Sequence, residues 1–410
     1  MVISSTKLIN SIQWLLTTFL IASFLLFDTY TWGKYSFIIC TVLIFLLTVV
    51  KNRGKIRVRI EPFILLFLAF TAYVALTALW AITPSDTLTM ARTLLRILVC
   101  FTLIYWAYCD EPDPLRMITM ITAASYVVAF YSVFVYGFDN IIHSSDDILL
   151  NKTYTNINSF ALFLAFGCIC DLYLILYDRF RIYSIISVLS ITIIAATQSR
   201  KAIVFLVLGA LMLLVFRFSQ STSMANRILR IVTILFLVLI GIYFLSQLPI
   251  FVGVNNRIER MINTFTGSGK MDHSSIVRKK MIELGLFCWS KRPFSGIGMS
   301  CTHTYAAMNL QIDKYLHNNY VDLLAGGGTV AFVLYYAMYA YLIWAYVRLR
   351  KVTPKIVVFG IITIILLLIT DYGRVTYYTK IVLYELMLLF LLARNAQVNR
   401  KDLTDDHEAD

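Results

Sequence analysis

Long apolar runs alternate with short polar segments along most of the chain. Each run covers about 15 to 22 residues, and a helix needs about 20 residues to cross the hydrocarbon core of a bilayer. The pattern predicts twelve membrane-spanning helices. They are placed at 11–30, 36–50, 62–80, 87–107, 115–136, 158–178, 182–198, 201–216, 229–248, 328–347, 356–370 and 376–393. The first run lacks a small-residue cleavage site, so we interpret it as a retained helix and not as a signal peptide.

One long segment outside the apolar runs interrupts this pattern two-thirds of the way along the chain. We therefore divide the chain into nine spans (1–248), a large loop (249–327), three further spans (328–393) and a tail (394–410). The last twelve residues of that tail, 399–410, are polar and are expected to be disordered.

The composition agrees with a membrane protein. Of the 410 residues, 59% are hydrophobic, and the mean hydropathy is +0.76. A soluble domain of this size is less apolar. We predict an all-α polytopic membrane protein with one large helical loop outside the bilayer.

Basic residues fall unevenly on the two sides of the predicted membrane. With the N-terminus inside, the inner segments hold 19 Lys and Arg, and the short outer segments hold six. This asymmetry follows the positive-inside rule and places both termini inside and the loop 249–327 outside. The net charge of +13 therefore reflects topology, and we expect no nucleic-acid partner.

The large loop carries nine basic residues and five acidic ones. Long outer loops escape the charge rule, yet the surplus suits an anionic, phosphate-bearing ligand at the outer surface. Residues 255–265 predict an amphipathic helix lying on the bilayer, with Arg257 and Arg260 on its polar side.

A second helix is predicted further along the loop. It begins at Ser274 or Ser275, carries Arg278 in its first turns and ends near Lys291, because Pro293 and a Gly-rich turn follow. The simpler interpretation is a helix packed over the bundle, and the functional one is a helix that presents Arg278 to a ligand.

Three arginines near the predicted outer boundary are candidates for ligand binding. Arg200 lies in the tight turn TQSRKA between two spans. It either neutralises the carbonyl end of the preceding helix or binds phosphate through its planar fork. Arg92 and Arg96 lie one turn apart on the fourth span. They either extend to the interface or face a polar cavity inside the bundle.

Asp171 is the acidic residue of the sixth span, and we expect it to reach toward Arg179 and Arg181. At the other end of that span, Asn156 and Asn158 open the helix, where asparagine is an ordinary cap.

His317 stands just before an apolar helix, in KYLHNNYVDLLAGGG. A lone histidine more often has a structural role than a catalytic one. This one lies at the outer mouth of a predicted span, in a loop rich in arginine. Histidine titrates near neutral pH and can accept a proton from an alcohol.

Cys288 and Cys301 both fall in the outer loop and could pair in an oxidising compartment, although spacing alone does not show pairing. The remaining five cysteines lie in or beside spans and are interpreted as small buried hydrophobes. No Cys/His cluster has the spacing of a zinc site, so we expect no metal.

Together these motifs resemble the O-antigen ligase and O-antigen polymerase superfamily of bacterial envelope glycosyltransferases. The matching pieces are NINSFA, TQSRKA, SSIVRKKM, RPFSGIGMS and HNNYVDLLAGGG, which lie over roughly residues 150–345. The last of them fits the family pattern of His, ten residues and Gly at His317 and Gly328, with the frequent Asn at Asn318. The sequence departs from the family at Gly326, where an acidic residue is common, and at Ala331, where a second glycine is common.

The resemblance implies a C-type glycosyltransferase fold of about twelve helices in the bacterial cytoplasmic membrane, with the active site at the outer face. It implies a glycan donor on undecaprenyl diphosphate, a glycan acceptor, inversion, and no cofactor or metal. The acceptor is another lipid-linked repeat for a polymerase and the lipid A core for a ligase. A chain-length regulator and a repeat-unit flippase are the partner proteins that it implies.

The residue roles follow from the same resemblance. His317 is expected to be the catalytic base, and Arg200 and Arg278 to bind the donor diphosphate. Accessory positions are Arg92, Arg96, Arg257, Arg260, Asn156, Asn158 and Asn318.

Two other classes of protein compete with an enzyme. A transporter or flippase predicts internal repeats and helices broken near the midplane, and neither is evident in the sequence. An inert scaffold leaves the Arg and His set without a role. Within the family we favour a polymerase over a ligase, because HNNYVDLLAGGG is followed by a Tyr-rich span. The sugar and the linkage stay open.

Overall fold

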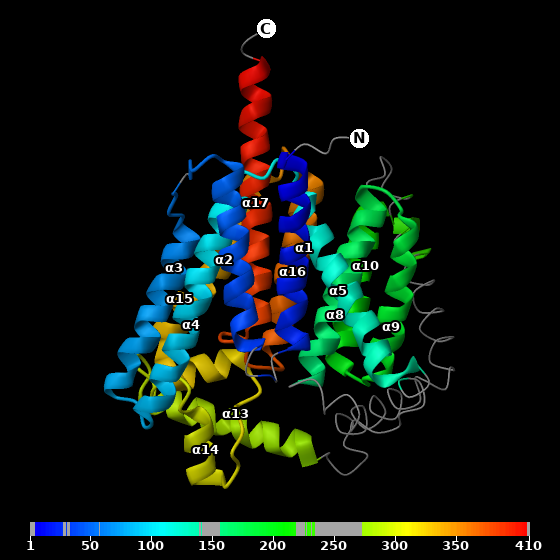
Figure 1. The fold of residues 1–410 in the computed structure, drawn as a ribbon. Coiled ribbons are helices and arrows are strands. Elements are labelled where there is room, and N and C mark those ends of the chain that lie inside the picture. Colours follow the sequence, from blue (N-terminus) through cyan, green and yellow to red (C-terminus); the bar gives the residue numbers. More distant parts are fainter. Residues whose placement is uncertain are drawn as a thin grey trace. The chain divides into compact units, whose positions relative to one another are not determined.

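The structure is a computed structural model. It describes residues 5–27, 30, 33–56, 58–138, 141, 156–218, 226, 228–230, 232–233 and 273–407. Within these ranges all regular structure is helical, and no strand occurs (Figure 1).

The helices follow the apolar runs closely. They are α1 (Ser5–Leu26), α2 (Gly33–Lys51), α3 (Pro62–Leu76), α4 (Pro84–Tyr108), α5 (Leu115–Tyr136), α8 (Ile157–Tyr177), α9 (Ile186–Ala196), α10 (Arg200–Phe218), α13 (His273–Lys291), α14 (Thr302–Leu310), α15 (Asn319–Leu349), α16 (Pro354–Asp371) and α17 (Lys380–His407), with short 3₁₀ turns at Thr77–Leu79 and Ile182–Ile185.

Nine described helices are long and apolar enough to cross a membrane, and two shorter apolar helices, Tyr35–Lys51 and Ile182–Ala196, fall on two further predicted spans. The prediction of an all-α polytopic membrane protein is therefore confirmed. The remaining predicted span, 229–248, lies outside the described residues apart from a few positions, as does the predicted surface helix 255–265 with its two arginines.

Two stretches of helix extend beyond the prediction. The tenth span was predicted to start at residue 328, which is where α15 is broken by the non-helical Gly328, and the helical stretch from Asn319 up to this break was not included in the span. The tail over 399–410 was expected to be disordered, but α17 continues to His407. Extending an existing helix adds one hydrogen bond per residue without a new nucleus, so a polar sequence can continue a helix that starts in a span.

The described helices fall into two compact units. Unit 1 comprises residues 1–47, 113–270 and 354–366. Its described part contains α1, most of α2, α5, α8, α9, α10 and the first part of α16. Here α8 packs against α5, which precedes it in the chain, and against α9 and α10, which follow it (Figure 1). Most of α8 is buried, from Phe160 to Leu174 almost without a break, so α8 is the central helix of this unit.

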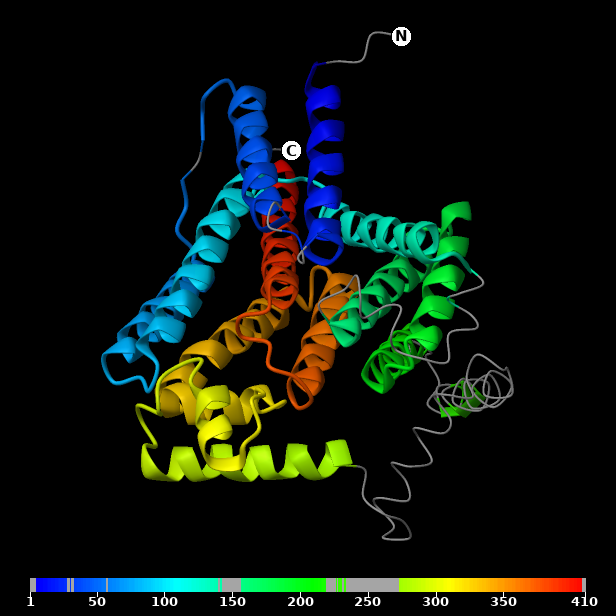
Figure 2. The same cartoon turned by 60° about the horizontal axis from the view of Figure 1, so that its bottom comes forward.

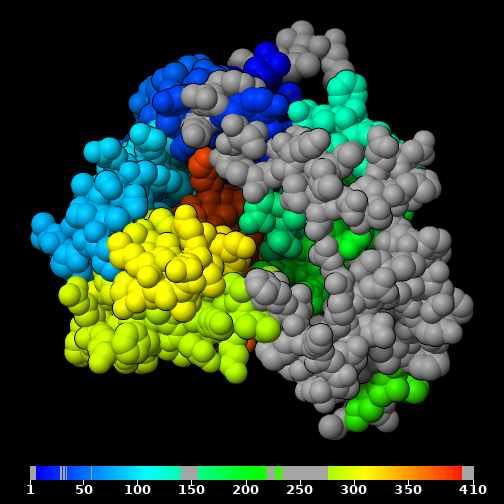
Figure 3. All heavy atoms as spheres, turned by 90° about the horizontal axis from the view of Figure 1, so that it is seen from below, coloured from blue at the N-terminus to red at the C-terminus, as the bar shows by residue number. Residues whose placement is uncertain are grey.

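Unit 2 comprises residues 48–112, 271–353 and 367–410. Here α3, α4, α15 and α17 pack together, and α13 lies crosswise against α15 (Figures 1 and 2). Seen from below, α13 and α14 cover one end of this unit (Figure 3).

Contacts within unit 2 sort its connections into two ends. At one end the α3–α4 turn bonds to the 293–301 segment, since Trp80 Nε1 donates to the Ser295 carbonyl at 3.0 Å. At the other end, Arg59 pairs with Asp110 at 3.4 Å and Arg394 with Glu61 at 3.5 Å. The second end holds Arg59 and Arg394, which the charge count assigns to one and the same side of the membrane.

Candidate functional site

The turn that carries Arg200 is fastened to the start of α8. Ser199 Oγ donates to Asn158 Oδ1 at 2.8 Å, and α10 begins at the next residue, Arg200. Gln198, just before, has a φ of +52°, which is an uncommon left-handed conformation for a residue other than glycine. The motifs NINSFA and TQSRKA are thus brought together in unit 1.

Asn156 has the ordinary role considered for it. Its side chain accepts from the backbone N–H groups of Asn158, at 3.0 Å, and Ser159, at 3.2 Å. It is therefore the N-cap of α8. Its neighbour Asn158 is different, because its side chain contacts the Arg200 turn.

Asp171 does not reach the arginines as expected. Its carboxylate accepts from Ser184 Oγ at 2.9 Å and from Ser187 Oγ at 2.7 Å, while Arg181 pairs with Asp178 at 2.6 Å. Hydroxyls on the next helix satisfy this buried carboxylate without bringing a second charge into the bundle.

His317 lies in a constrained turn in unit 2. Its φ is +57°, its side chain is half-buried, and its ring lies 4.2 Å from that of Tyr315, tilted by 50°. A left-handed backbone at a residue other than glycine costs free energy, and such residues cluster at functional sites. The helix α15 begins two residues later, so the imidazole stands at its N-terminal end.

Asn318 caps that helix. It is buried, and its side chain accepts from the Val321 backbone N–H at 3.1 Å. One turn into α15, buried Asp322 accepts from Thr302 Oγ1 of α14 at 2.7 Å. The His317 turn is thereby tied to α14 as well as to α15.

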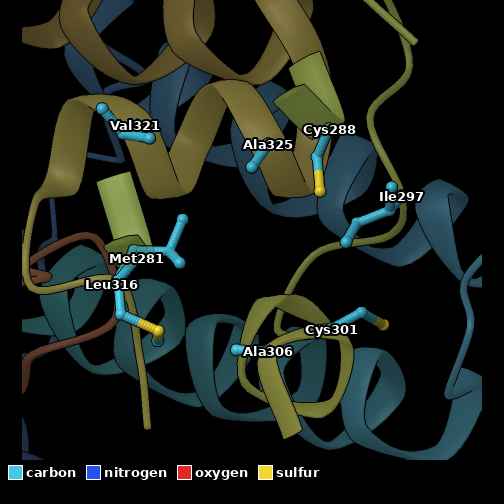
Figure 4. Packing of buried hydrophobic residues seen from close by; sticks show 8 residues of the cluster. All are labelled: Met281, Cys288, Ile297, Cys301, Ala306, Leu316, Val321 and Ala325. Atoms are coloured by element: carbon cyan, nitrogen blue, oxygen red, sulfur yellow. The ribbon is translucent and has the colours of Figure 1, made fainter. Parts of the chain in front are cut away.

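Helix α13, which carries Arg278, packs directly against the same turn. Met281 and Leu316 are buried in one apolar cluster with Val321 and Ala325 (Figure 4). Gly285 makes this approach possible, since a Cβ there would lie 2.4 Å from Val321 Cγ1 and 2.6 Å from Leu316 Cδ1. Arg278 is one turn from Met281, so its backbone position is fixed relative to the His317 turn.

The segment RPFSGIG docks on the kink of α15. Backbone N–H groups of Ile297 and Gly298 donate to the carbonyls of Ala325 and Gly326 at 2.9 and 2.8 Å. Tyr73 of α3 donates its hydroxyl to the Gly327 carbonyl at 2.9 Å. A kink frees carbonyls from the helix ladder, and these donors satisfy them.

The surface of this end of unit 2 mixes cations with exposed aromatic rings. Lys279 and Lys280 of α13 are exposed, and the Lys291 ammonium lies 5.4 Å from the centre of the Phe287 ring. Phe294 is exposed as well. An apolar and basic surface of this kind suits the polar boundary of a bilayer.

The two loop cysteines are free and buried. Burial raises the pKa of the Cys288 thiol to about 11, and Cys301 Sγ lies 3.3 Å from Thr83 Oγ1. They act here as small core side chains, the first in the apolar cluster of Figure 4 and the second also against the α3–α4 turn.

The remaining candidate positions fall into three groups. Arg92 and Arg96 are both exposed on α4, Arg257 and Arg260 lie outside the described residues, and Arg200 belongs to unit 1. Among the described residues, no group of three or more His, Cys, Asp or Glu side chains could hold a metal ion.

A buried polar cluster beside the His317 turn was not predicted from the sequence. Asn319 and Asp371 are both fully buried, and Asn319 Nδ2 donates to Asp371 Oδ2 at 3.3 Å. The available signals were the second asparagine of HNN and an acidic residue at the end of an apolar run, since an ionisable residue there is seldom incidental.

The fold and this arrangement define a class: an all-helical, multi-pass membrane protein with a structured polar loop docked on the mouth of a kinked span. A comparison with protein families then adds the family, because residues 185–336 match the family described as O-antigen ligase. This match confirms the resemblance to the O-antigen ligase and polymerase superfamily over that stretch of the chain. Proteins of that family are glycosyltransferase-like enzymes of polysaccharide biosynthesis. A comparison with curated proteins finds no match.

Proposed function

We propose that this protein is a membrane glycosyltransferase that polymerises oligosaccharide repeat units carried on undecaprenyl diphosphate. The reaction is placed at the outer face of the bacterial cytoplasmic membrane, with both chain termini in the cytoplasm. The family match supports transfer of an envelope glycan, and the membrane fold supports a lipid-linked donor.

The observation that carries the proposal is the His317 turn. A half-buried imidazole is held by left-handed backbone at the start of α15. The helix that carries Arg278 is packed against the same turn. A general base must be held within hydrogen-bond reach of the proton that it accepts. A guanidinium on the neighbouring helix can stabilise developing negative charge.

The proposed step balances without a metal. His317 accepts the proton of the acceptor hydroxyl while that oxygen forms a bond to the anomeric carbon of the donor. The bond from this carbon to the diphosphate breaks on the opposite face, so the configuration is inverted. Undecaprenyl diphosphate leaves with the electron pair, and Arg278 and Arg200 are proposed to stabilise its charge through forked hydrogen bonds.

A ligase that transfers the glycan to a lipid A core sugar is the second candidate, and the description of the matched family favours it. The chemistry at the donor is the same, and only the acceptor differs. The polymerase interpretation rests on the Tyr-rich span that follows the His317 motif. The ring of Tyr336 in this span stacks on that of Tyr320 in the motif, with ring centres 5.1 Å apart.

A transporter is the rival from another class. The kink in α15 is a feature that transporters share and that we did not expect from the sequence. Donors within the same unit satisfy the carbonyls at this kink, as expected of a rigid site.

The experiment that separates these functions uses purified protein in lipid nanodiscs with a fluorescent, undecaprenyl-diphosphate-linked repeat. A polymerase produces longer lipid-linked glycans from this substrate alone. A ligase gives no product until lipid A core is added. Movement of the label across the membrane of a proteoliposome without a new glycosidic bond would identify a transporter and would overturn the proposal.

A further inference from the structure

The polar cluster beside the His317 turn is centred on Asn319. Asn319 Oδ1 accepts from the backbone N–H groups of Thr376, at 2.8 Å, and Tyr377, at 3.1 Å. Its Nδ2 lies 3.1 Å from Tyr336 Oη and 3.3 Å from Asp371 Oδ2. One side chain therefore joins α15 to the end of α16 and to the segment before α17.

These contacts occupy almost all the hydrogen-bonding capacity of the Asn319 side-chain amide. A side-chain amide offers two N–H donors and one oxygen with two lone pairs, and both lone pairs and the amino group have partners here. Asp371 is bound in turn by Tyr336 Oη at 2.9 Å and by Thr376 Oγ1 at 2.6 Å. A buried, satisfied network of this kind permits one arrangement of the chain, since any other arrangement leaves buried groups without partners.

The network acts on the turn that carries His317. That turn is held on one side by buried Leu316, which packs against α13. On the other side it is held by Asn318, which caps α15, and by Asn319, the first residue of α15, which accepts a hydrogen bond from the Thr376 backbone N–H. Residues on both sides of His317 are therefore fixed, and the backbone between them has a left-handed φ of +57°, a conformation that residues other than glycine seldom adopt.

We propose that Asn319 is a positioning residue for His317: it fixes the turn of the base by fastening the start of α15 to the 371–377 segment. This inference rests on the proposed role of His317. Asn319 is not proposed to touch substrate.

The experiment compares Asn319→Ala and the exchange variant Asn319→Asp/Asp371→Asn with the native protein. The exchange keeps an acceptor for Thr376 and Tyr377 at position 319, and it restores a donor–acceptor pair between 319 and 371 with the direction reversed. Transfer rate, affinity for a polyprenyl diphosphate and thermal unfolding are measured for each. Asn395→Ala is the matched control. Asn395 is fully buried in α17 of the same unit, and among the described residues neither its Oδ1 nor its Nδ2 has a hydrogen-bond partner.

Asn319→Ala is expected to slow transfer by roughly ten- to a hundredfold, which is typical of a misplaced catalytic group. Affinity for the diphosphate should stay within about twofold, because the arginines are unchanged and Asn319 makes no proposed ligand contact. The exchange variant should recover most of the rate, and Asn395→Ala should have the native rate.

The proposal is overturned if Asn319→Ala keeps the native rate, or if rate, affinity and unfolding temperature fall together while the exchange restores none of them. Should Asn319→Ala not fold, Asn319→Asp at pH 8 replaces it, because two facing carboxylates then repel each other. A native rate in this variant also overturns the proposal.

His317→Ala is assayed in parallel. If it is fully active, the role of His317 itself is wrong, whereas an inactive His317→Ala beside a fully active Asn319→Ala refutes only the positioning role.

Discussion

At the scale of single residues, Arg200 and His317 are each positioned by contacts of the residues next to them in the chain. Asn158 accepts from Ser199 beside Arg200, and Leu316 and Asn318 flank His317 with an apolar and a capping contact. The sequence could nominate Arg200, Arg278 and His317 because charged or titratable groups in the polar segments between spans are conspicuous. The family resemblance also named Asn158 and Asn318 as accessory positions. The contacts of these two, and the anchors Ser199, Leu316 and Asn319, were not predicted, because a residue's partners in the fold cannot be read from its type.

The arginines give the first prediction at this scale. Arg278→Ala and Arg200→Ala should each strongly reduce transfer in nanodiscs while the protein still inserts and unfolds normally. Lys should rescue only partly, because an ammonium cannot reproduce the forked contact with phosphate oxygens. Lys279→Ala is the control for Arg278, since Lys279 is exposed on the same helix. Full activity of Arg200→Ala would remove Arg200 from the donor site.

Cys288 gives a second prediction. Burial raises the pKa of its thiol to about 11, so very little of the reactive thiolate forms at pH 7.5. In a variant that keeps Cys288 alone, maleimide labelling should be slow in the native protein and should become rapid on denaturation. The labelling rate should rise as the pH increases toward that pKa. Fast labelling of folded protein at pH 7.5 would contradict the buried position of this residue.

At the scale of elements, the kink of α15 determines how the polar loop is attached. Gly328 has φ +67° and ψ −170°, a conformation almost restricted to glycine. The loop segment 293–298 occupies the break, with Thr329 N–H bonded to the Pro293 carbonyl at 2.7 Å. The two motifs that the sequence presents separately, RPFSGIG and HNNYVDLLAGGG, are thus one structure.

Gly328→Ala should therefore destabilise the protein, by about 1–3 kcal/mol from the backbone conformation alone. The added Cβ would also lie 2.2 Å from the Phe294 carbonyl oxygen. Gly326→Ala is the control, because the atoms nearest to its Cβ would be Gly298 O and Met299 Sδ at 3.4 Å and Met299 Cα at 3.5 Å, which is close to ordinary van der Waals contact. Thermal unfolding in detergent measures both variants. Equal unfolding temperatures would show that the Gly328 conformation is not required.

Helix existence was easier to predict from the sequence than helix ends. The length and hydropathy of a run reflect the bilayer directly, so most spans were found. The stretch of α15 before Gly328 was not predicted as part of the span because NYVDLLAGG has mixed polarity. Its helical structure is supported by the Asn318 cap and by packing against α13. The predicted end of α13 at Lys291 was confirmed. This end could be predicted because a proline restricts the backbone of the residue before it, and that effect depends on the nearby sequence alone.

At the scale of the whole molecule, the account depends on the side of the membrane to which the polar loop belongs. The positive-inside asymmetry predicts both termini in the cytoplasm and residues 249–327 outside. Reporter fusions after Ser268 and after Asp405 should therefore report opposite sides. If the two fusions report the same side, the proposed catalytic end of unit 2 does not face an extracytoplasmic substrate.

The most direct test of the central claim is the rate of glycan transfer by His317 variants in nanodiscs, measured against pH with a defined undecaprenyl-diphosphate-linked repeat. His317→Ala should lose a factor of about 10²–10⁴, as expected for a missing acid–base group, while it still binds the donor. The native rate should fall as the pH is lowered and the imidazole becomes protonated, because imidazolium cannot accept the hydroxyl proton. A His317→Gln enzyme with near-native turnover and the native pH profile would contradict the assignment of His317 as the base.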